Sequence, residues 1–169
     1  SLGSEVALEA SALELGRENL VTIGGSEDGV LLVEFPWSPL IPPEEIVFGL
    51  QSMGYSLVIA HPERSHGLDL EQLEGWVQSG TVFTQLELGS FIGLYGPTIG
   101  RRAELILERQ LVHMAATDLH GTGNLSDTLD QAIATIEERY GPAGRRLLLE
   151  DNPRALLAGE IEHIEALKP

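Results

Sequence analysis

The amino-acid sequence predicts an α/β fold built from parallel strand–helix units. Short apolar runs that suit buried strands alternate with longer segments in which apolar residues recur at helical spacing. Two strands end in residues that can ligate metal ions: His61 follows the run 55–60, and Asp118 and His120 end the run 111–121. Side chains at the carboxyl ends of parallel strands form the sites of α/β barrels and doubly wound sheets.

The first third of the chain supplies three strands and two helices in alternation. Residues 1–8 run into a strand-like pattern, and residues 10–19 are rich in Leu, Glu and Ala, which favour a helix. Residues 29–35 form an apolar strand, and prolines break the chain after it. Two of these prolines and two glutamates suit the first turn of a helix over 42–53, which leads into the strand 55–60.

The same alternation continues through the rest of the chain. An amphipathic helix over 70–78 precedes a β-branched strand over 81–88 and a Gly-rich loop at 89–96. The remaining expected elements are the helix 99–110, the strand of 111–121, the polar loop 122–127, the helix 129–136, the strand 147–150 and a short helix over 152–157. No repeat or linker interrupts this pattern, so residues 1–169 are expected to form one domain.

Composition excludes several classes of function. Ten basic residues against 26 acidic ones leave a formal net charge of −16, which argues against binding to nucleic acid or to an anionic membrane surface. Most of this acidic excess is expected to be solvated surface. The chain has no cysteine, so disulfides, zinc–thiolate clusters and cysteine nucleophiles are excluded. No apolar run is long enough for membrane insertion.

Two motifs carry most of the chemical information. H-P-E-R at 61–64 follows one predicted strand, and T-D-L-H at 117–120 ends another. Because side chains in a strand alternate between its faces, Asp118 and His120 are expected to point the same way. Carboxylate and imidazole ligands without sulfur suit Mn²⁺, Fe²⁺ or Zn²⁺ better than Mg²⁺. The guanidinium of Arg64 is suited to binding phosphate oxygens through two parallel hydrogen bonds.

Each candidate also has an ordinary structural explanation. An Asp-x-His pair is common by chance, a histidine after an apolar run is more often a core residue, and Glu5 by itself is typical of an exposed turn. Their occurrence together at the ends of successive predicted strands favours a shared site. His66, His113 and His163 are assigned to structure or surface. No base accompanies Ser90, so a serine triad is not indicated.

A series of motifs along the whole chain resembles a known family. The motifs are G-S-E-V at 3–6, L-L-V-E-F-P at 31–36, G-Y-S-L-V-I-A-H-P-E-R at 54–64, A-T-D-L-H-G at 116–121 and L-E-D-N-P at 149–153. Their order and content resemble the bacterial manganese-dependent tyrosine-protein phosphatases of capsule and exopolysaccharide loci. These enzymes belong to the PHP (polymerase and histidinol phosphatase) superfamily. The resemblance implies a distorted, TIM-like (β/α)₇ barrel with a metal cluster at the carboxyl ends of its strands.

The resemblance also implies a set of metal ligands. Glu5 matches the bridging carboxylate, His61 matches a ligand histidine, and Asp118 and His120 match the last ligand strand. The family site holds two or three Mn²⁺ ions, with Fe or Zn as alternatives. The family's N-terminal H-x-H strand has no counterpart here. The chain is therefore expected to correspond to the C-terminal two-thirds of the PHP domain, without the first βα units, and to form a homo-oligomer or pair with the missing N-terminal fragment.

The activity implied is hydrolysis of phosphotyrosine in a cytoplasmic protein that regulates capsule or exopolysaccharide synthesis. In that reaction a metal-bound hydroxide attacks the phosphate monoester, Asp118 and Arg64 are catalytic, and Arg64 with Ser90 of the loop 89–96 binds substrate. The implied partner is a phosphotyrosine protein, a bacterial tyrosine kinase of polysaccharide export. Two alternatives remain open: a histidinol-phosphatase-like enzyme for small molecules, and an inactive truncated PHP domain that acts as a binding or assembly module.

Overall fold

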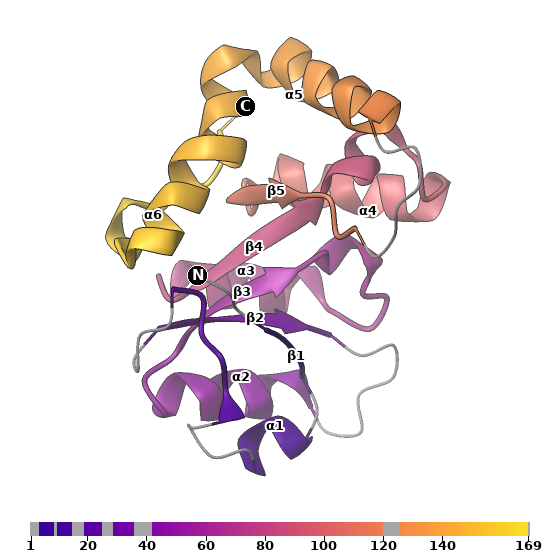
Figure 1. Ribbon diagram of the computed structural model, residues 1–169. Coiled ribbons are helices and arrows are strands. Elements are labelled where there is room, and N and C mark those ends of the chain that lie inside the picture. The colour runs from indigo at the N-terminus through magenta and orange to yellow at the C-terminus, as the bar shows by residue number, and fades with distance from the viewer. Residues whose placement is uncertain are drawn as a thin grey trace.

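Five parallel strands form one sheet at the centre of the protein (Figure 1). The computed structural model describes residues 4–8, 10–14, 19–24, 29–35, 42–119 and 126–168. The strands lie side by side in the order of the sequence: β1 (Glu5–Ala7), β2 (Val30–Glu34), β3 (Ser56–Ala60), β4 (Val82–Glu87) and β5 (Met114–Ala116). Each neighbouring pair is parallel, as the alternation of strands and helices predicted.

Helices connect successive strands of the sheet and follow its last strand. They are α1 (Ala10–Glu14), α2 (Pro43–Ser52), α3 (Leu70–Gln78), α4 (Pro97–Glu108), α5 (Ser126–Arg146) and α6 (Asn152–Ala158). The predicted start of α2 is confirmed, with proline in its first turn beside two glutamates. Asp69 caps the start of α3, and its carboxylate accepts hydrogen bonds from the backbone N–H groups of Glu71 and Gln72. No helix in the described part of the chain combines the length and the apolar character that a bilayer crossing requires.

The two faces of the sheet belong to different hydrophobic clusters. One face packs against the helices that connect the strands and forms the larger core, with Leu57 of β3 and Leu50 of α2 fully buried in it. The other face carries alternate residues of the same strands, among them Val58 and Phe83, and packs against Leu156 of α6. By this alternation the glutamates of the strands, Glu5, Glu34 and Glu87, are directed to the second face.

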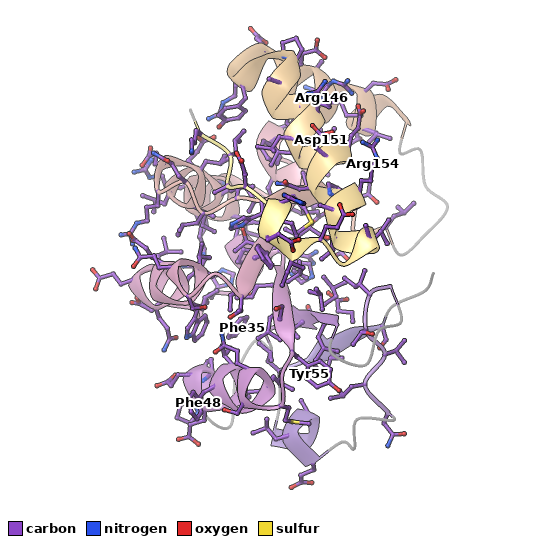
Figure 2. The ribbon with its side chains drawn as sticks, turned by 90° about the vertical axis from the view of Figure 1, so that its left-hand side faces the viewer. Phe35, Phe48, Tyr55, Arg146, Asp151 and Arg154 are labelled. Carbon is purple, nitrogen blue, oxygen red and sulfur yellow. The ribbon has the colours of Figure 1, made fainter. Side chains whose placement is uncertain are left out.

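The strand predicted at 147–150 is wrong. The segment Leu147–Asp151 is a π-helical turn that joins α5 to α6, with Leu148 buried. A short apolar run does not by itself distinguish a strand from a buried helical turn, because both bury consecutive side chains. Asp151 pairs with Arg146 on one side (3.0 Å) and Arg154 on the other (3.6 Å), which suits a helical path (Figure 2).

Asn152 fastens the C-terminal segment to the sheet. Its side chain is 1% exposed, and its Nδ2 donates hydrogen bonds to the carbonyl oxygens of His113 (2.6 Å) and Glu165 (2.7 Å). Its Oδ1 accepts a hydrogen bond from the backbone N–H of Glu165 at 3.2 Å. Three backbone groups of two distant segments are therefore satisfied by one amide.

The Asn152→Ala variant is expected to lose about 2–4 kcal/mol of unfolding free energy, because it leaves buried backbone groups without partners. The corresponding fall in melting temperature is about 5–15 °C for a chain of this size. Thermal and urea unfolding followed by circular dichroism measure it. Gln131→Ala removes an exposed amide from α5 and is expected to change stability by less than about 0.5 kcal/mol. Equal stability of the two variants would refute the fastening role.

Candidate active site

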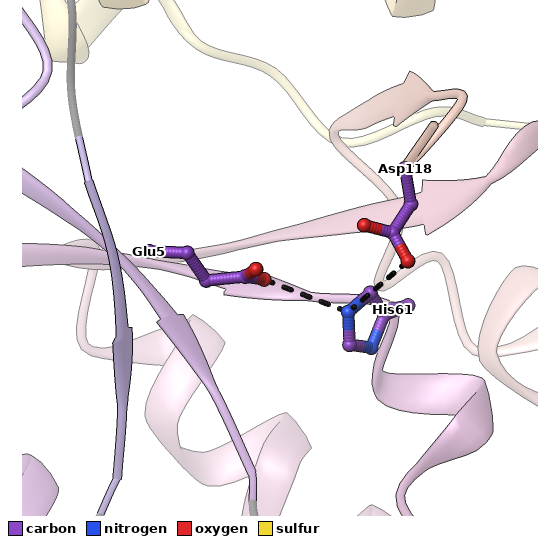
Figure 3. Close-up of side chains that lie close together, drawn as sticks. All are labelled: Glu5, His61 and Asp118. Carbon is purple, nitrogen blue, oxygen red and sulfur yellow. Dashed lines mark ion pairs between the residues drawn. The ribbon is translucent and has the colours of Figure 1, made fainter. Parts of the chain in front are cut away.

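Three predicted metal ligands meet on the second face of the sheet. Glu5 lies in β1, and His61 and Asp118 follow the carboxyl ends of β3 and β5. The Nε2 atom of His61 lies 3.5 Å from Glu5 Oε1 and 3.7 Å from Asp118 Oδ2 (Figure 3). One ligand atom from each of the three residues falls within 4.8 Å of the others. Glu34 brings a third carboxylate, with its Oε1 3.7 Å from the same nitrogen.

The backbone at two of these residues is unusual. His61 has φ 31° and Asp118 has φ 44°, both in the left-handed region that side chains other than glycine rarely adopt. Among the described residues, Gln110 alone joins them as a non-glycine residue with positive φ. Such conformations cost free energy and concentrate at functional sites, where the surrounding structure enforces them. The chain therefore turns sharply after β3 and β5 and directs both side chains into the cluster.

The cluster fits a divalent cation. Two ligand atoms that are each about 2.1 Å from one ion lie about 3.0–3.4 Å apart when the angle at the ion is about 90–110°. The distances from His61 Nε2 to Glu5 and Asp118, 3.5 and 3.7 Å, are slightly longer than this. Several carboxylates that converge on one imidazole repel one another unless a positive charge lies between them. The Nδ1 atom of His61 is buried and has no hydrogen-bond partner among the described residues, so this ring is held by its packing and its Nε2 contacts. Oxygen and nitrogen donors of this kind suit Mn²⁺, Fe²⁺ or Zn²⁺.

Arg64 lies directly beside the cluster, at the end of the short helical turn Pro62–Arg64. Its Nη1 donates hydrogen bonds to Asp118 Oδ2 at 2.7 Å and to Glu87 Oε2 at 3.1 Å. The arginine side chain is 35% exposed, whereas the Glu87 side chain is 4% exposed. One edge of the guanidinium is therefore anchored in the protein while the group as a whole remains accessible to an anion.

A second layer of carboxylates lies beneath Arg64. Glu63 is fully buried, and its Oε1 accepts hydrogen bonds from the backbone N–H of Glu87 (2.9 Å) and the hydroxyl of Ser90 (2.7 Å). Burial raises the pKa of Glu63, and these hydrogen bonds oppose the rise. Burial also raises the pKa of Glu87 to about 7, against the lowering effect of the Arg64 guanidinium. Glu87 accepts a further hydrogen bond from the hydroxyl of Tyr95.

The structure brings some of the predicted site residues together but not all of them. The structure brings Glu5, His61 and Asp118 together, although Glu5 is the first residue of β1 and not its carboxyl end. Because β1 has only three residues, its two ends are close enough for the glutamate to reach the cluster. Ser90 is buried with its hydroxyl bonded to Glu63, so its role in substrate binding stays a prediction. The strand predicted in 111–121 is too long: β5 covers only Met114–Ala116, and Asp118 lies beyond it with φ 44°, so strand alternation does not set its direction. His120 lies outside the described residues.

Two acidic residues of the site were not singled out in the sequence. Glu34 and Glu87 are the last residues of β2 and β4, which is the position that drew attention to His61 and Asp118 after β3 and β5. Each lies one residue before the end of its predicted strand, 29–35 or 81–88, so strand-end position marks both as candidates, but only the register of the sheet places them in the site. The structural assignment of His113 is confirmed: it is buried, its Nδ1 accepts a hydrogen bond from the backbone N–H of Thr84, and burial lowers its pKa to about 4.

Comparison with known proteins gives a consistent result. A family model described as capsular polysaccharide synthesis, CpsB/CapC, matches residues 1–158. The chain is 26% identical over 151 residues to tyrosine-protein phosphatase YwqE of Bacillus subtilis, covering 87% of this chain and 58% of that protein. It is 29% identical over 170 residues to tyrosine-protein phosphatase CpsB of Streptococcus pneumoniae, covering 94% of this chain and 68% of that protein. The chain thus spans about three-fifths to two-thirds of the length of these relatives.

A solved structure shows the same arrangement of the chain. It comes from a crystallographic study of YwqE from Bacillus subtilis and CpsB from Streptococcus pneumoniae, described as unique metal-dependent tyrosine phosphatases. The TM-score is 0.75 at 26% identity, and the match covers 93% of this chain and 64% of the other. The likeness therefore extends over nearly all of the sheet and helices described above.

Proposed function

The chain belongs to the CpsB/CapC family of capsular polysaccharide synthesis, and we propose that it is a metal-dependent phosphatase that hydrolyses phosphotyrosine. The observation that carries this proposal is the placement of Arg64 against the acidic cluster. Its guanidinium donates a 2.7 Å hydrogen bond to Asp118, whose carboxylate also approaches His61. A cation site with an arginine at its edge is an arrangement that stabilises the charge of a transferring phosphoryl group.

Glu5, His61 and Asp118 are proposed to hold the metal, with Glu34 as an additional ligand because of its distance from His61. His120 remains a proposed ligand on the strength of the T-D-L-H motif. Mn²⁺ is the proposed metal, in a site of two or three ions. When bound, such ions lower the pKa of water and neutralise negative charge on phosphoryl oxygens.

The chain's own residues would bind and orient the substrate phosphate. Arg64 offers a planar guanidinium that matches two phosphate oxygens at once. Asp118 has two roles in this proposal, because it is both a ligand of the metal and a hydrogen-bond acceptor that orients Arg64. A phosphate held between the cation and the guanidinium would have its charge neutralised on two sides, which stabilises the transition state of the transfer.

The fold context supports the same proposal. The strands are parallel and in sequence order, their connecting helices pack on one face, and acidic side chains lie on the other. This is the pattern of a barrel wall whose interior face carries the site. We therefore propose that residues 1–169 form part of one distorted PHP-type barrel domain. The proposed substrate is the phosphotyrosine of a bacterial tyrosine kinase of polysaccharide export.

Turnover by the Mn²⁺-loaded 169-residue chain tests this function. Phosphotyrosine peptide, phosphoserine peptide and histidinol phosphate are compared at equal concentrations by phosphate release. Phosphotyrosine is expected to be hydrolysed at least about 10-fold faster than the other two, given the discrimination a site of this kind can reach. Preference for histidinol phosphate would indicate a small-molecule phosphatase. No release from any of the three by fully metal-loaded protein would indicate a binding or assembly module.

A further inference from the structure

Tyr95 contacts Arg64 by two separate routes. The Tyr95 hydroxyl donates a hydrogen bond to Glu87 Oε1, and the other oxygen of that carboxylate accepts from Arg64 Nη1 at 3.1 Å. The Tyr95 ring also faces the guanidinium directly, with Arg64 Cζ 5.4 Å from the ring centroid. A cation above an aromatic face at this distance is attracted by the ring's electron density. Glu87 and Tyr95 therefore form a clamp on Arg64, and this pair is called the arginine clamp below.

The clamp occupies one nitrogen of the guanidinium and leaves the others available. Both hydrogen bonds of Arg64 to the described residues, to Glu87 and to Asp118, come from Nη1. Nε and Nη2 make no hydrogen bond to any residue in the described part of the chain. These two nitrogens form the edge of the guanidinium that binds an anion through two parallel hydrogen bonds. The contacts thus fix the group without blocking its anion-binding edge.

The surrounding loop is shaped to seat the Tyr95 ring. A side chain at Gly89 would place its Cβ 2.7 Å from Cε2 of Tyr95 and 3.0 Å from its hydroxyl oxygen, so the Tyr95 ring would have to move to admit it. Glu63 anchors the same loop through the backbone of Glu87 and the hydroxyl of Ser90. Burial of a carboxylate such as Glu87 costs free energy unless charged partners compensate, and Arg64 is the cation beside it.

We propose that Glu87 and Tyr95 are positioning residues that hold Arg64 with its Nε–Nη2 edge toward the substrate phosphate. This inference rests on the proposed phosphatase function but assigns two residues that neither motif of the sequence contains. It explains why Tyr95 of the loop and Glu87 at the end of β4 both contact Arg64. It also gives the loop 89–96 a role through Tyr95, where the sequence directed attention to Ser90.

The test compares Glu87→Gln and Tyr95→Phe with the wild-type chain at pH 8. Nitrogen NMR of the metal-free protein measures rotation about the Nε–Cζ bond of Arg64, with the signal assigned by its loss in Arg64→Lys. Calorimetry with inorganic phosphate then measures anion binding by the metal-loaded chain. Each variant is expected to speed the rotation and to weaken phosphate binding by roughly 10-fold, with the metal content unchanged.

A second trio in the same chain supplies matched controls. Arg139 forms two 2.7 Å hydrogen bonds with Glu104, and its Cζ lies 5.2 Å above the ring of Tyr140. Glu104→Gln and Tyr140→Phe therefore remove the same groups from an arginine on the surface. They are expected to leave the Arg64 signal and phosphate affinity unchanged.

The outcomes separate this inference from the function on which it rests. Unchanged Arg64 rotation in Tyr95→Phe, a mild variant that keeps its ring, would overturn the clamp whatever the activity. Absence of phosphate binding by the wild-type chain would overturn it as well. Weakened phosphate binding and freer Arg64 in both clamp variants, with no turnover of phosphotyrosine by the wild-type chain, would uphold the clamp and reject the proposed function.

Discussion

The Asp118→Asn variant is expected to bind divalent metal at least about 100-fold more weakly than the wild-type chain and to lose the proposed phosphatase activity. An amide is a poorer ligand than a carboxylate because it carries no charge. The substitution also removes the acceptor of the 2.7 Å hydrogen bond from Arg64, so the cation site and the arginine are both disturbed. The variant keeps the shape of the side chain, which limits any effect on folding.

Metal per chain, measured by elemental analysis after dialysis against Mn²⁺, is the first readout, because it does not depend on activity. The wild-type chain is expected to retain at least one ion. Asp130→Asn makes the same chemical change at an exposed position of α5 and is the matched control. If Asp118→Asn and Asp130→Asn retain equal metal at limiting concentrations, the cluster of Glu5, His61 and Asp118 is not the metal site.

Arg64→Ala is expected to lower kcat on phosphotyrosine peptide by about 10²–10³-fold while the metal content stays close to that of the wild-type chain. The loss follows from removing the group proposed to neutralise the phosphate oxygens on the side away from the cation. Arg64→Lys keeps a positive charge but not the planar pair of donors, so its kcat is expected to lie between those of the wild-type chain and Arg64→Ala. Steady-state kinetics at saturating Mn²⁺ measure all three proteins.

Arg154→Ala provides the comparison, because Arg154 is exposed and its contact with Asp151 is a surface ion pair. Its kcat is expected to match that of the wild-type chain. A kcat for Arg64→Ala within about twofold of the wild-type value would exclude the arginine from catalysis. Parallel loss of metal in Arg64→Ala would instead assign the residue to holding Asp118, since the two side chains form an ion pair.

Local sequence patterns predicted the elements that depend on nearby residues. Helix α3 has the predicted bounds because its capping residue and its apolar spacing lie within one short segment. The strands β2, β3 and β4 were found within one or two residues for the same reason. The segment Leu147–Asp151 was assigned wrongly because three successive leucines suit a buried strand and a helical turn equally. The helices on either side of this segment, α5 and α6, favour the helical turn over the strand.

The sequence by itself determined which kinds of side chain form the centre of the site. H-P-E-R and T-D-L-H stand directly after strands, so parallel pairing brings His61, Arg64 and Asp118 to one edge of the sheet. Only the tertiary structure decided which other groups join them. Glu34 and Glu87 enter because alternate residues of β2 and β4 face the same side. Tyr95 reaches Arg64 because the chain turns back after β4. These contacts depend on register, sheet twist and loop path, which arise from packing between segments far apart in the sequence.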